Sequence, residues 1–387
     1  MNDIRHVLVA GGGVGGLSAA LAFAQRGVEV MVIERRPDFE IPGVGLGQPA
    51  NALRVYDALG VLDEILEIGF AYDHMTIVDA ERRLIAEHKF LLGDDRVPSF
   101  CALPRSDLHR ILVDAARKAG VTIRLGVHVT AIDETQNDRA AVTFSDGSSA
   151  TFDLMAGFDG IRSTTRTQLF GTMFVPRHSG FGAWRVQVPK EDCVTGMEFW
   201  QGIEGKVGAM PIGKNLMYLF NIRPEPAGAL YEREEMAPLF KQRLAQFGGF
   251  VARIRAGLNR DSDIVYSPIE PMLVPWPWHR GRVVIGGDAA HVFAPHLTQG
   301  AAMAVEDAFV LVREVMKAEG PIEQRLMRYA QERYGRCAFV YTFSGQWLEQ
   351  EQSIHTPEQM DAARRELTLN ASNRIAVSDR ILNTRIL

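Results

Sequence analysis

The residues near the N-terminus that are most able to do chemistry are three glycines, spaced Gly11-x-Gly13-x-x-Gly16, and the acid Glu34. Glycines at this spacing permit a tight turn, let the backbone approach a pyrophosphate, and let a helix pack closely on the preceding strand. An acidic side chain about twenty residues further on accepts hydrogen bonds from ribose hydroxyls. These residues predict a dinucleotide site. Its expected members are Gly11, Gly13, Val14, Gly15, Gly16, Glu34 and Arg35.

The neighbouring segments contain the elements that would position this site. The apolar run 6–10 is typical of a buried parallel strand, and the apolar positions between Leu17 and Ala24 predict a helix that ends near Gly27. A second apolar run, 28–34, places Glu34 at the end of the next strand. The alternative is a glycine-rich turn that only packs a helix, with Glu34 as an ordinary exposed residue.

A second acid, Asp288, follows another apolar strand in the segment "RVVIGGDAAH". A nicotinamide dehydrogenase does not need this second site, whereas FAD does, because its sugar-alcohol chain requires a hydroxyl acceptor far from the adenosine end. The next segment predicts a helix with Thr298 as its N-cap and one apolar stripe. The backbone N–H groups of Gly300 and Ala301 at its start could face the negative edge of a reduced flavin.

Three motifs in order resemble the class A flavoprotein monooxygenases of the para-hydroxybenzoate and salicylate hydroxylase kind. They are the first glycine motif, "GFDGIRSTTR" at 157–166 and "GDAAHVFAPHLTQGAAMAVEDA" at 287–308. The last of them is similar to the pyridine-acid branch, of which 6-hydroxynicotinate 3-monooxygenase is an example. The resemblance implies an α/β fold, in which a Rossmann-like FAD-binding domain of the GR2 type carries an inserted sheet-and-helix substrate domain.

The resemblance also assigns cofactor roles to residues outside the first motif. Arg105 would contact the FAD phosphate and ribityl region, the Val129 backbone would contact adenine, and Asp159 would serve FAD and transient NAD(P)H. Asp288 would hold the ribityl chain, while Pro295, Gly300 and Ala301 would border the flavin ring. For Arg105 and Asp159 a surface ion pair or a turn-stabilising role remains the alternative.

The chain departs from the family pattern at two places. Many relatives have Gly-Gln-Gly-x-Asn where this chain has residues 298–302, "TQGAA". The helix start is kept, but an asparagine contact to the flavin is lost. A histidine is expected in the "GVGLGQP" loop of the pyridine hydroxylases, and Gly47 stands there instead.

The implied reaction is a hydroxylation of a small phenolic or hydroxypyridine-type aromatic acid, as in aromatic catabolism. NAD(P)H would reduce FAD, and O2 would form a flavin C4a-hydroperoxide that delivers oxygen to the ring. Such a reaction needs an apolar pocket and an acceptor for the substrate's hydroxyl proton. His296 and Tyr218 are the candidate catalytic residues, and Gln48 and Arg185 are further candidates for substrate binding. A loop histidine and a core tyrosine are the plainer interpretations of the first two.

Other functions of this sequence stay open. "WPWH" at 276–279 is superficially similar to the Trp-x-Trp signature of flavin halogenases, so a halogenase or a reductase on the same fold is one alternative. A non-catalytic flavin-binding protein and a plain NAD dehydrogenase are two others.

The order of the segments predicts the domain organisation. We assign 1–75, 101–175 and 276–345 to the FAD-binding domain, 76–100 and 176–275 to the substrate domain, and 346–387 to a C-terminal helical tail. Residues 38–51, rich in Gly and Pro, are expected to be a loop, and the substrate domain is expected to hold one helix, at 234–248.

Composition narrows the class of protein. The formal net charge is −5, from 42 basic and 47 acidic residues, which suggests neither nucleic acid nor an anionic membrane as a partner. Three scattered cysteines predict neither disulfides nor a metal site. With no signal-like or membrane-spanning segment, we expect a cytoplasmic monomer or homodimer.

Overall fold

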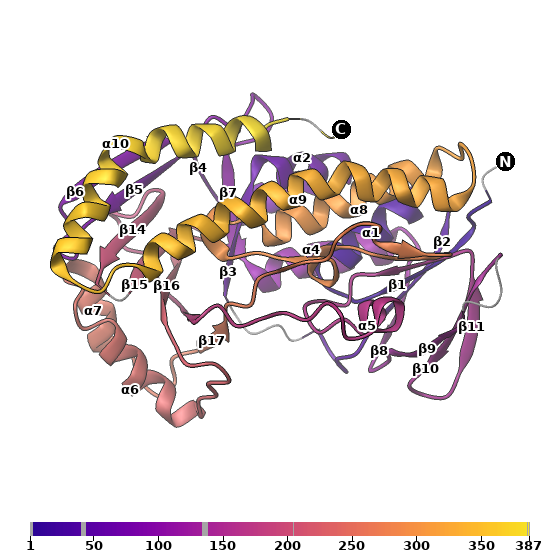
Figure 1. Ribbon diagram of the computed structural model, residues 1–387, viewed down its shortest axis with the longest axis horizontal. Coiled ribbons are helices and arrows are strands. Elements are labelled where there is room, and N and C mark those ends of the chain that lie inside the picture. Colours follow the sequence, from indigo (N-terminus) through magenta and orange to yellow (C-terminus); the bar gives the residue numbers. More distant parts are fainter. Residues whose placement is uncertain (1–2, 40–43, 134–137, 204, 385, 387) are drawn as a thin grey trace.

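A six-stranded sheet forms the centre of the computed structural model, which describes residues 3–39, 44–133, 138–203, 205–384 and 386 (Figure 1). Its strand order is β19-β20-β12-β1-β2-β8, and all neighbours are parallel except the edge pair β19 and β20. The strands are β1 (His6–Ala10), β2 (Glu29–Glu34), β8 (Thr122–Leu125), β12 (Leu154–Gly157), β19 (His279–Arg280) and β20 (Val283–Ile285). The parallel arrangement brings the carboxyl ends of β1, β12 and β20 to one edge, and all three motifs begin there.

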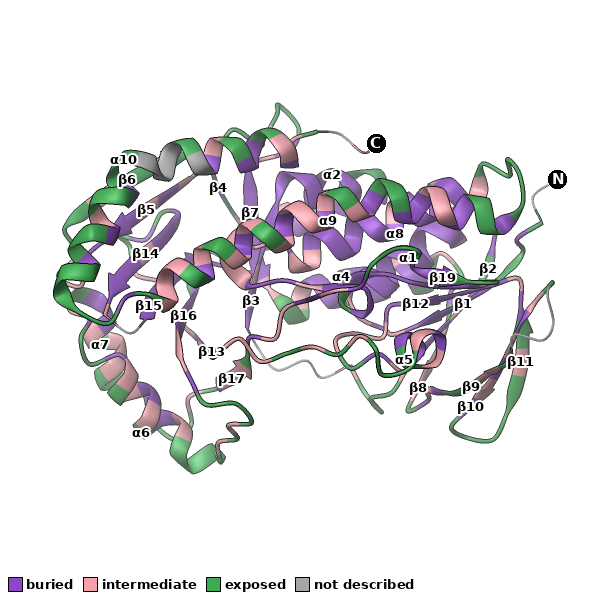
Figure 2. Cartoon of the chain, viewed as in Figure 1, coloured by how far each residue is buried: buried purple, intermediate pink, exposed green. Residues whose placement is uncertain are grey.

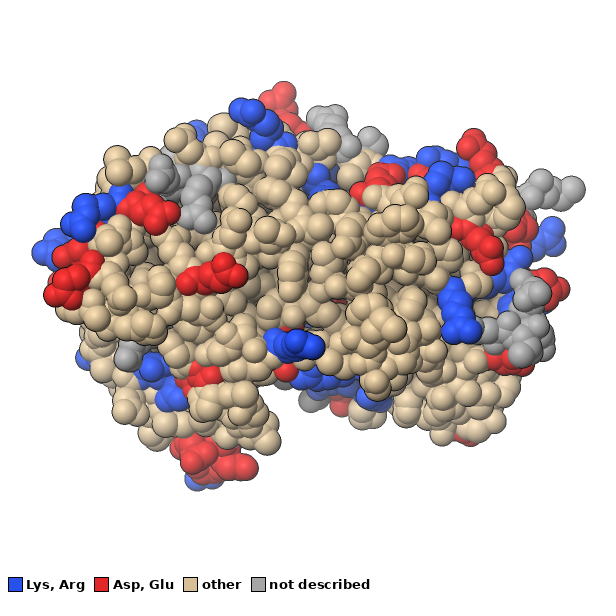
Figure 3. All heavy atoms as spheres, in the orientation of Figure 1, with Lys and Arg blue, Asp and Glu red and all other residues tan. Residues whose placement is uncertain are grey.

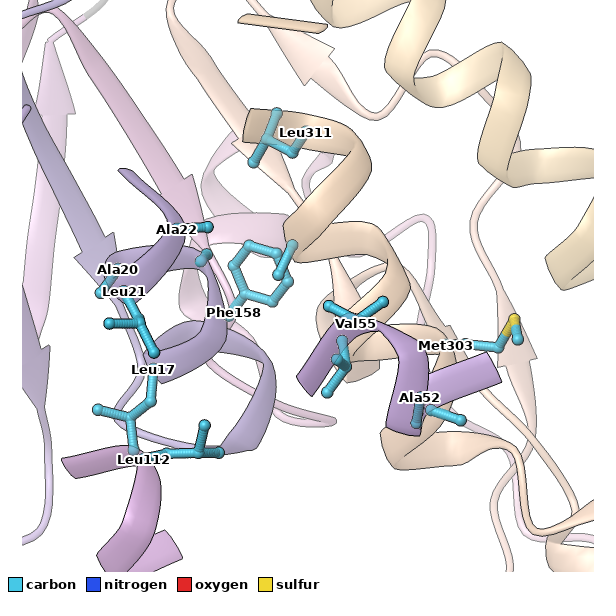
Figure 4. Packing of buried hydrophobic residues seen from close by; sticks show 14 of the residues in the cluster. Leu17, Ala20, Leu21, Ala22, Ala52, Val55, Leu112, Phe158, Met303 and Leu311 are labelled. Carbon is cyan, nitrogen blue, oxygen red and sulfur yellow. The ribbon is translucent and has the colours of Figure 1, made fainter. Parts of the chain in front are cut away.

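Helices cover one face of this sheet. They are α1 (Val14–Ala24), α4 (Arg105–Lys118), α8 (Gly300–Met316) and α9 (Ile322–Gln352), and α1 packs against both α4 and α8. The Phe158 ring, just after β12, fills the space between α1 and α8 (Figure 4). The other face carries a small antiparallel sheet of β9 (Val129–Asp133), β10 (Ala140–Phe144) and β11 (Ser149–Phe152), with α5 (Thr164–Phe170) beside it. The predicted strand-turn-helix-strand unit is confirmed.

A seven-stranded sheet, in the order β17-β13-β16-β15-β14-β5-β6, forms the second large layer. Its strands are β5 (His74–Val78), β6 (Leu84–Lys89), β13 (Phe181–Pro189), β14 (Met197–Gly202), β15 (Gly205–Pro211), β16 (Leu216–Pro224) and β17 (Ile264–Pro268). Trp184 and Trp200 are fully buried where one face of this sheet meets the helices of the 233–257 segment.

That segment contains two helices instead of the single one expected. They are α6 (Arg233–Arg243) and α7 (Gly249–Gly257). The chain turns between them at Gly249, whose φ is +54° and where an added Cβ would lie 2.9 Å from the Trp200 ring. Such a backbone conformation and such a close approach favour glycine. The helix expected at 234–248 is present as α6 but ends at Arg243, and the expectation of a single helix in this domain was wrong because α7 follows.

The described part of the segment 38–51 also contains regular structure where a loop was expected. Residues 40–43 lie outside the described residues, but β3 (Gly45–Pro49) pairs with β7 (Phe100–Pro104), which also pairs with β4 (Phe70–Tyr72). Helix α2 (Ala50–Ala58) follows directly, and α3 (Leu62–Ile68) comes after it. The glycines of β3 mark close packing: a Cβ on Gly45 would lie 2.5 Å from Ile212, and one on Gly47 would lie 2.9 Å from Thr298.

The C-terminal helices extend along the whole molecule. Helix α9 contacts α8, and α10 (Pro357–Leu382) turns back to pack on β6 of the second sheet (Figure 1). Helix α8 is buried along most of its length, whereas α9 and α10 alternate buried and exposed residues (Figure 2). Four short elements complete the described fold. Strand β18 (Met272–Leu273) pairs with β21 (His291–Val292), and the 3-10 turns are η1 (Gly287–Ala289) and η2 (Pro295–Leu297).

The surface shows no large field of one charge on the face drawn in Figure 3, where acidic and basic residues are interspersed. This face is hollowed along its lower edge, between the part that carries α6 and the part that carries α5. Across the part of the chain that the structure describes, no helix combines the length and apolarity needed to cross a membrane.

Candidate active site

A cavity of about 280 Å³ opens at the N-terminus of α1. Gly11, Gly13, Glu34, Arg35 and Val129 line it, together with Asp159 and its neighbours. Gly11 has a φ of +111°, and a Cβ there would lie 2.2 Å from the Phe158 carbonyl oxygen, so only glycine fits. Within the described chain no side chain caps α1, whose N-cap is Gly13, and its first N–H groups are therefore available to a phosphate.

Glu34 is fixed at the rim of this cavity by two backbone donors. Its carboxylate accepts hydrogen bonds from the N–H groups of Gly12 and Arg36, both at 2.9 Å. A carboxylate can accept further bonds beyond these two, so its orientation is set while acceptor capacity remains for ribose hydroxyls.

Three of the expected residues lie behind the cavity rather than on its wall. A Cβ on Gly16 would lie 2.0 Å from the Gly11 carbonyl oxygen, and one on Gly15 would lie 2.9 Å from Phe158. These glycines let α1 pack against β1 and α8. Val14 also lies outside the set of lining residues, at the first position of α1.

Asp159 lines the cavity, but its carboxylate is engaged within its own loop. It accepts hydrogen bonds from the Ser163 hydroxyl at 2.5 Å, from the Thr164 hydroxyl at 3.2 Å, and from both the N–H and the hydroxyl of Thr165 at 2.9 Å. Asp159 therefore shapes the loop after β12, because four donors surround its oxygens. Its direct role toward FAD and NAD(P)H stays a prediction.

Arg166 joins the second motif to the third. Its buried guanidinium donates to the carbonyl oxygens of Ile161 at 2.8 Å, Phe174 at 3.1 Å and Ala289 at 3.0 Å. The loop after β12 and the turn after β20 are thus held together by one side chain, which sequence reasoning had not singled out.

A second cavity, of about 390 Å³, lies between the two large sheets. Arg105 and Asp288 are exposed to it, and neither side chain forms a hydrogen bond or ion pair with the residues that the structure describes. Burial among protein atoms raises the pKa of Asp288, although His291 and Arg105 oppose this. A cation and an acceptor that both face the same cavity are suited to a ligand that carries phosphate and hydroxyl groups.

The N-terminus of α8 borders the same cavity. Pro295, Gly300 and Ala301 line it, and the helix begins at Gly300 after the N-cap Gln299. Thr298 was expected to be the N-cap, but it adopts the left-handed conformation with φ 56° and ends the turn η2. Since no side chain of the described chain caps α8, its first N–H groups are available to a ligand in the cavity.

A buried ionic network fixes α8 in this position. Arg333 of α9 donates to Asp307 at 2.7 Å and to Glu306 at 2.6 Å, and all three side chains are 0% exposed. Asp307 also pairs with His291 at 2.6 Å and accepts the Gly287 N–H at 2.9 Å. His291, Asp307 and Cys337 lie close enough to surround a metal ion, but the Arg333 guanidinium already supplies the positive charge at Asp307.

The substrate candidates on the second sheet come together beside this helix end. Arg185 of β13 and Tyr218 of β16 both line the cavity on paired strands. The Arg185 guanidinium donates to the Ser267 hydroxyl and, at 3.3 Å, to the Ala183 carbonyl oxygen. Burial raises the pKa of Tyr218, and the nearby Arg185 partly offsets this. Gly47 faces the same cavity at the position where a histidine was expected, and it has no room for a side chain.

Gln48 is not brought to the cavity. It is 0% exposed and accepts a hydrogen bond from the Tyr56 hydroxyl of α2 at 3.1 Å. Gln48 is absent from the residues that line the larger cavity, and its side chain is turned toward α2. Its contact with substrate stays a prediction that this arrangement does not support.

His296 lines the cavity and has two charged neighbours that sequence reasoning missed. Its Nε2 lies 3.0 Å from Glu351 of α9, and the other oxygen of Glu351 lies 2.5 Å from Nζ of Lys206 on β15. Lys206 had a detectable signal, because it is a charged residue in the fully buried strand Gly205–Pro211. Glu351 had no such signal in the sequence, because the same helix also carries exposed acidic residues and nothing local distinguishes this one from them.

An apolar recess of about 80 Å³ adjoins this cavity. It shares Met197, Phe199, Lys206 and His296 with the larger cavity and continues toward α10. Its remaining walls are mainly apolar and include Ile77, Phe90, Phe100, Trp347 and Leu382.

The residues present fit FAD on structural grounds. The first cavity offers a glycine cradle, a helix N-terminus and an oriented carboxylate, which suits an adenosine diphosphate moiety. The second offers Arg105, Asp288 and the uncapped start of α8, which suits a ribityl chain and a ring system.

Comparison with known proteins supports the same interpretation. A family model described as "FAD binding domain" matches residues 5–234 and 272–344. The Bacillus subtilis protein YetM, which carries the name of a FAD-dependent monooxygenase, is 33% identical over 347 residues, or 89% of this chain and 93% of YetM. A Pseudomonas aeruginosa 2-heptyl-3-hydroxy-4(1H)-quinolone synthase is 32% identical over 358 residues, or 88% and 90% of the two chains.

Among solved structures, a variant of Klebsiella pneumoniae HpxO complexed with FAD is similar throughout. The TM-score is 0.86 at 25% sequence identity, and the match covers 98% of this chain and 99% of the HpxO chain.

Proposed function

Because the chain belongs to the FAD-binding-domain family of class A FAD-dependent aromatic monooxygenases, we propose that it uses NAD(P)H and O2 to hydroxylate a small phenolic or hydroxypyridine-type aromatic acid. The observation that carries the substrate class is the composition of the larger cavity. Arg185, Tyr218 and His296 line it together with Arg105, Lys206 and Asp288, and most of the remaining lining residues are apolar or glycine. FAD, when bound, supplies electron transfer from NAD(P)H and the activation of O2.

The chain's own residues divide the remaining tasks. Met210, Phe199 and Phe220 are apolar walls that exclude water from the reacting ring. Arg185 is the cation for a substrate carboxylate, and Tyr218 is a hydroxyl that can hydrogen-bond a ring substituent. Burial and the charge of Lys206 lower the pKa of His296 despite Glu351, so His296 is neutral at pH 7 and can accept the proton of an aromatic hydroxyl.

A second substrate class is favoured by the apolar recess. A hydroxylated ring in the larger cavity could place an aliphatic substituent beside Ile77, Phe90 and Trp347. The quinolone synthase relative, whose named product carries a heptyl group, makes this class worth testing beside the plain aromatic acids.

The test is a substrate panel on the purified holoenzyme. Hydroxybenzoates, hydroxypyridine carboxylates and 2-alkyl-4-quinolones are each supplied with NADH or NADPH, and coenzyme consumption is measured together with product mass. A mass gain of one oxygen atom, with coenzyme use stimulated by the same compound, supports the proposal. Stimulated coenzyme use that yields only hydrogen peroxide with every compound contradicts the substrate classes, and absence of stimulation by all of them contradicts hydroxylation of such rings.

A further inference from the structure

Three ionisable side chains from different parts of the chain meet where the larger cavity joins the apolar recess. We call His296 of η2, Glu351 of α9 and Lys206 of β15 the buried trio. Their side chains are 2%, 9% and 6% exposed, respectively. His296 and Lys206 line both hollows, and Glu351 lines the recess.

The hydrogen bonds of the trio are directional. Glu351 offers one carboxylate oxygen to Nε2 of His296 at 3.0 Å and the other to Nζ of Lys206 at 2.5 Å. Nδ1 of His296 is buried and has no hydrogen-bond partner among the described residues. One ring nitrogen is therefore engaged with the protein, and the other is a buried nitrogen without a partner, in a side chain that lines both the cavity and the recess.

We propose that Glu351 is a positioning residue that fixes the proton of neutral His296 on Nε2, so that Nδ1 takes the proton of the substrate's aromatic hydroxyl while Lys206 keeps Glu351 ionised. The inference rests on the proposed function and adds to it a tautomer, an acceptor atom and two supporting residues. In the step itself, the substrate O–H bond breaks and an N–H bond forms at Nδ1. The electron pair stays on the phenolate oxygen.

The tautomer follows from the charge of the acceptor. A carboxylate can only accept, so the ring nitrogen that faces it must carry the proton, and the other nitrogen keeps its lone pair. When Nδ1 takes a proton, the imidazolium is stabilised by the adjacent carboxylate. This is the arrangement by which a buried acid orients and supports a catalytic histidine in hydrolases.

Lys206 is needed because the site is buried. Burial by itself raises the pKa of Glu351, but Lys206 and His296 outweigh it and lower this pKa to about 2. Glu351 is thus ionised throughout the physiological range. The lysine and the glutamate also neutralise each other, which allows both to lie against the apolar walls of Phe199 and Trp347.

Other charged groups line the same two spaces. Arg105, Arg185 and Asp288 line the larger cavity, and Asp379 of α10 lines the recess. Asp379 accepts the Leu91 N–H at 3.0 Å and lies 3.4 Å from His88. Its partners therefore lie toward β6. Among the described residues, His296 and Lys206 are the ionisable groups that line both spaces.

The test uses 4-nitrophenol, whose ionised form has its own visible absorbance, as a probe bound to the FAD-loaded protein. Difference spectra against ligand-free protein give the apparent pKa of the bound phenol. The main variant is the double substitution Lys206→Gln and Glu351→Gln, which keeps the net charge and leaves no buried ion unpaired. Its matched control is Arg260→Gln with Glu234→Gln, because that pair, 2.7 Å apart, is 74% and 59% exposed.

The expected result is a bound phenol pKa that rises by one unit or more in the trio double variant, which is about a tenfold loss of ionisation at a given pH. The control pair and the conservative Glu351→Asp substitution should leave it close to wild type. Weaker probe binding with an unchanged pKa would indicate a purely structural role and would overturn the inference. Should the main variant fail to retain FAD, the apolar pair Lys206→Met and Glu351→Leu is measured, with the same expected rise and the same contrary outcome.

The two proposals fail in different ways. Failure of the proposed function appears in the wild-type protein as an absence of hydroxylated product across the panel. Failure of the role assigned to the buried trio appears as an unchanged pKa of bound 4-nitrophenol in the trio double variant. This outcome is independent of the result of the substrate panel.

Discussion

Substituting Arg333 with methionine tests whether the buried ionic network holds the flavin side of the active site together. The substitution removes the cation from Asp307 and Glu306, all of which are fully buried. Removing one partner of a buried ion pair typically costs about 3–5 kcal/mol. We expect the lower end, about 3 kcal/mol, because Asp307 keeps His291 and Glu306 keeps Arg336 at 2.8 Å.

The assay is urea denaturation followed by circular dichroism, on protein with and without FAD. The matched control is Arg260→Met, which removes an exposed ion pair and should cost about 0–1 kcal/mol. The FAD dissociation constant should also rise in Arg333→Met, since Asp307 holds the Gly287 N–H in the turn that presents Asp288. A change in unfolding free energy below about 1 kcal/mol, or an effect equal to that of the control, would refute the reasoning.

Four further outcomes are expected. Gly11→Ala should yield protein that retains much less FAD, measured as the ratio of flavin to protein absorbance, because its Cβ would lie 2.2 Å from a backbone oxygen. Glu34→Gln should weaken FAD binding about tenfold in a fluorescence titration, whereas Glu29→Gln, at the exposed start of the same strand, should not. The pKa of Asp307 is lowered to about 2 because His291 and Arg333 outweigh its burial. The ionised carboxylate therefore stabilises the folded protein fully above its usual pKa, and this contribution is lost as the pH falls from about 4 to about 2. In the Asp307→Asn variant, an acid titration of the unfolding free energy should lack that part of the loss. Arg185→Met should weaken the binding of aromatic acids about tenfold, measured by flavin difference spectra. The affinity for the same aromatic compound without its carboxylate should be unchanged.

The sequence by itself determined the fold class and the family. The period and length of its apolar runs, together with glycines at fixed spacing, specify local structure that needs no distant partner. The strand at 6–10, the helix after it and the strand ending at Glu34 were found where expected. The apolar run before Asp288 likewise forms a central strand, and the FAD-dependent monooxygenase family that these motifs indicated is confirmed.

Local patterns were misleading where a glycine is required by contacts with residues that are distant in the sequence. Gly45 and Gly47 suggested a loop, yet they lie in strand β3. They are glycines because Ile212 and Thr298 leave no space for a side chain. A sequence shows which residue is small or acidic, but not which distant atom occupies the adjacent space.

Only the tertiary structure decided which residues surround the candidate base. His296 was visible in the third motif, but Lys206 and Glu351 are separated from it by 90 and 55 positions in the sequence and share no motif with it. Their meeting depends on the tertiary packing that brings β15 and η2 to the C-terminal part of α9. The physical reason is that charge–charge contacts in a protein interior are set by the packing of whole layers, and no short stretch of residues contains that information.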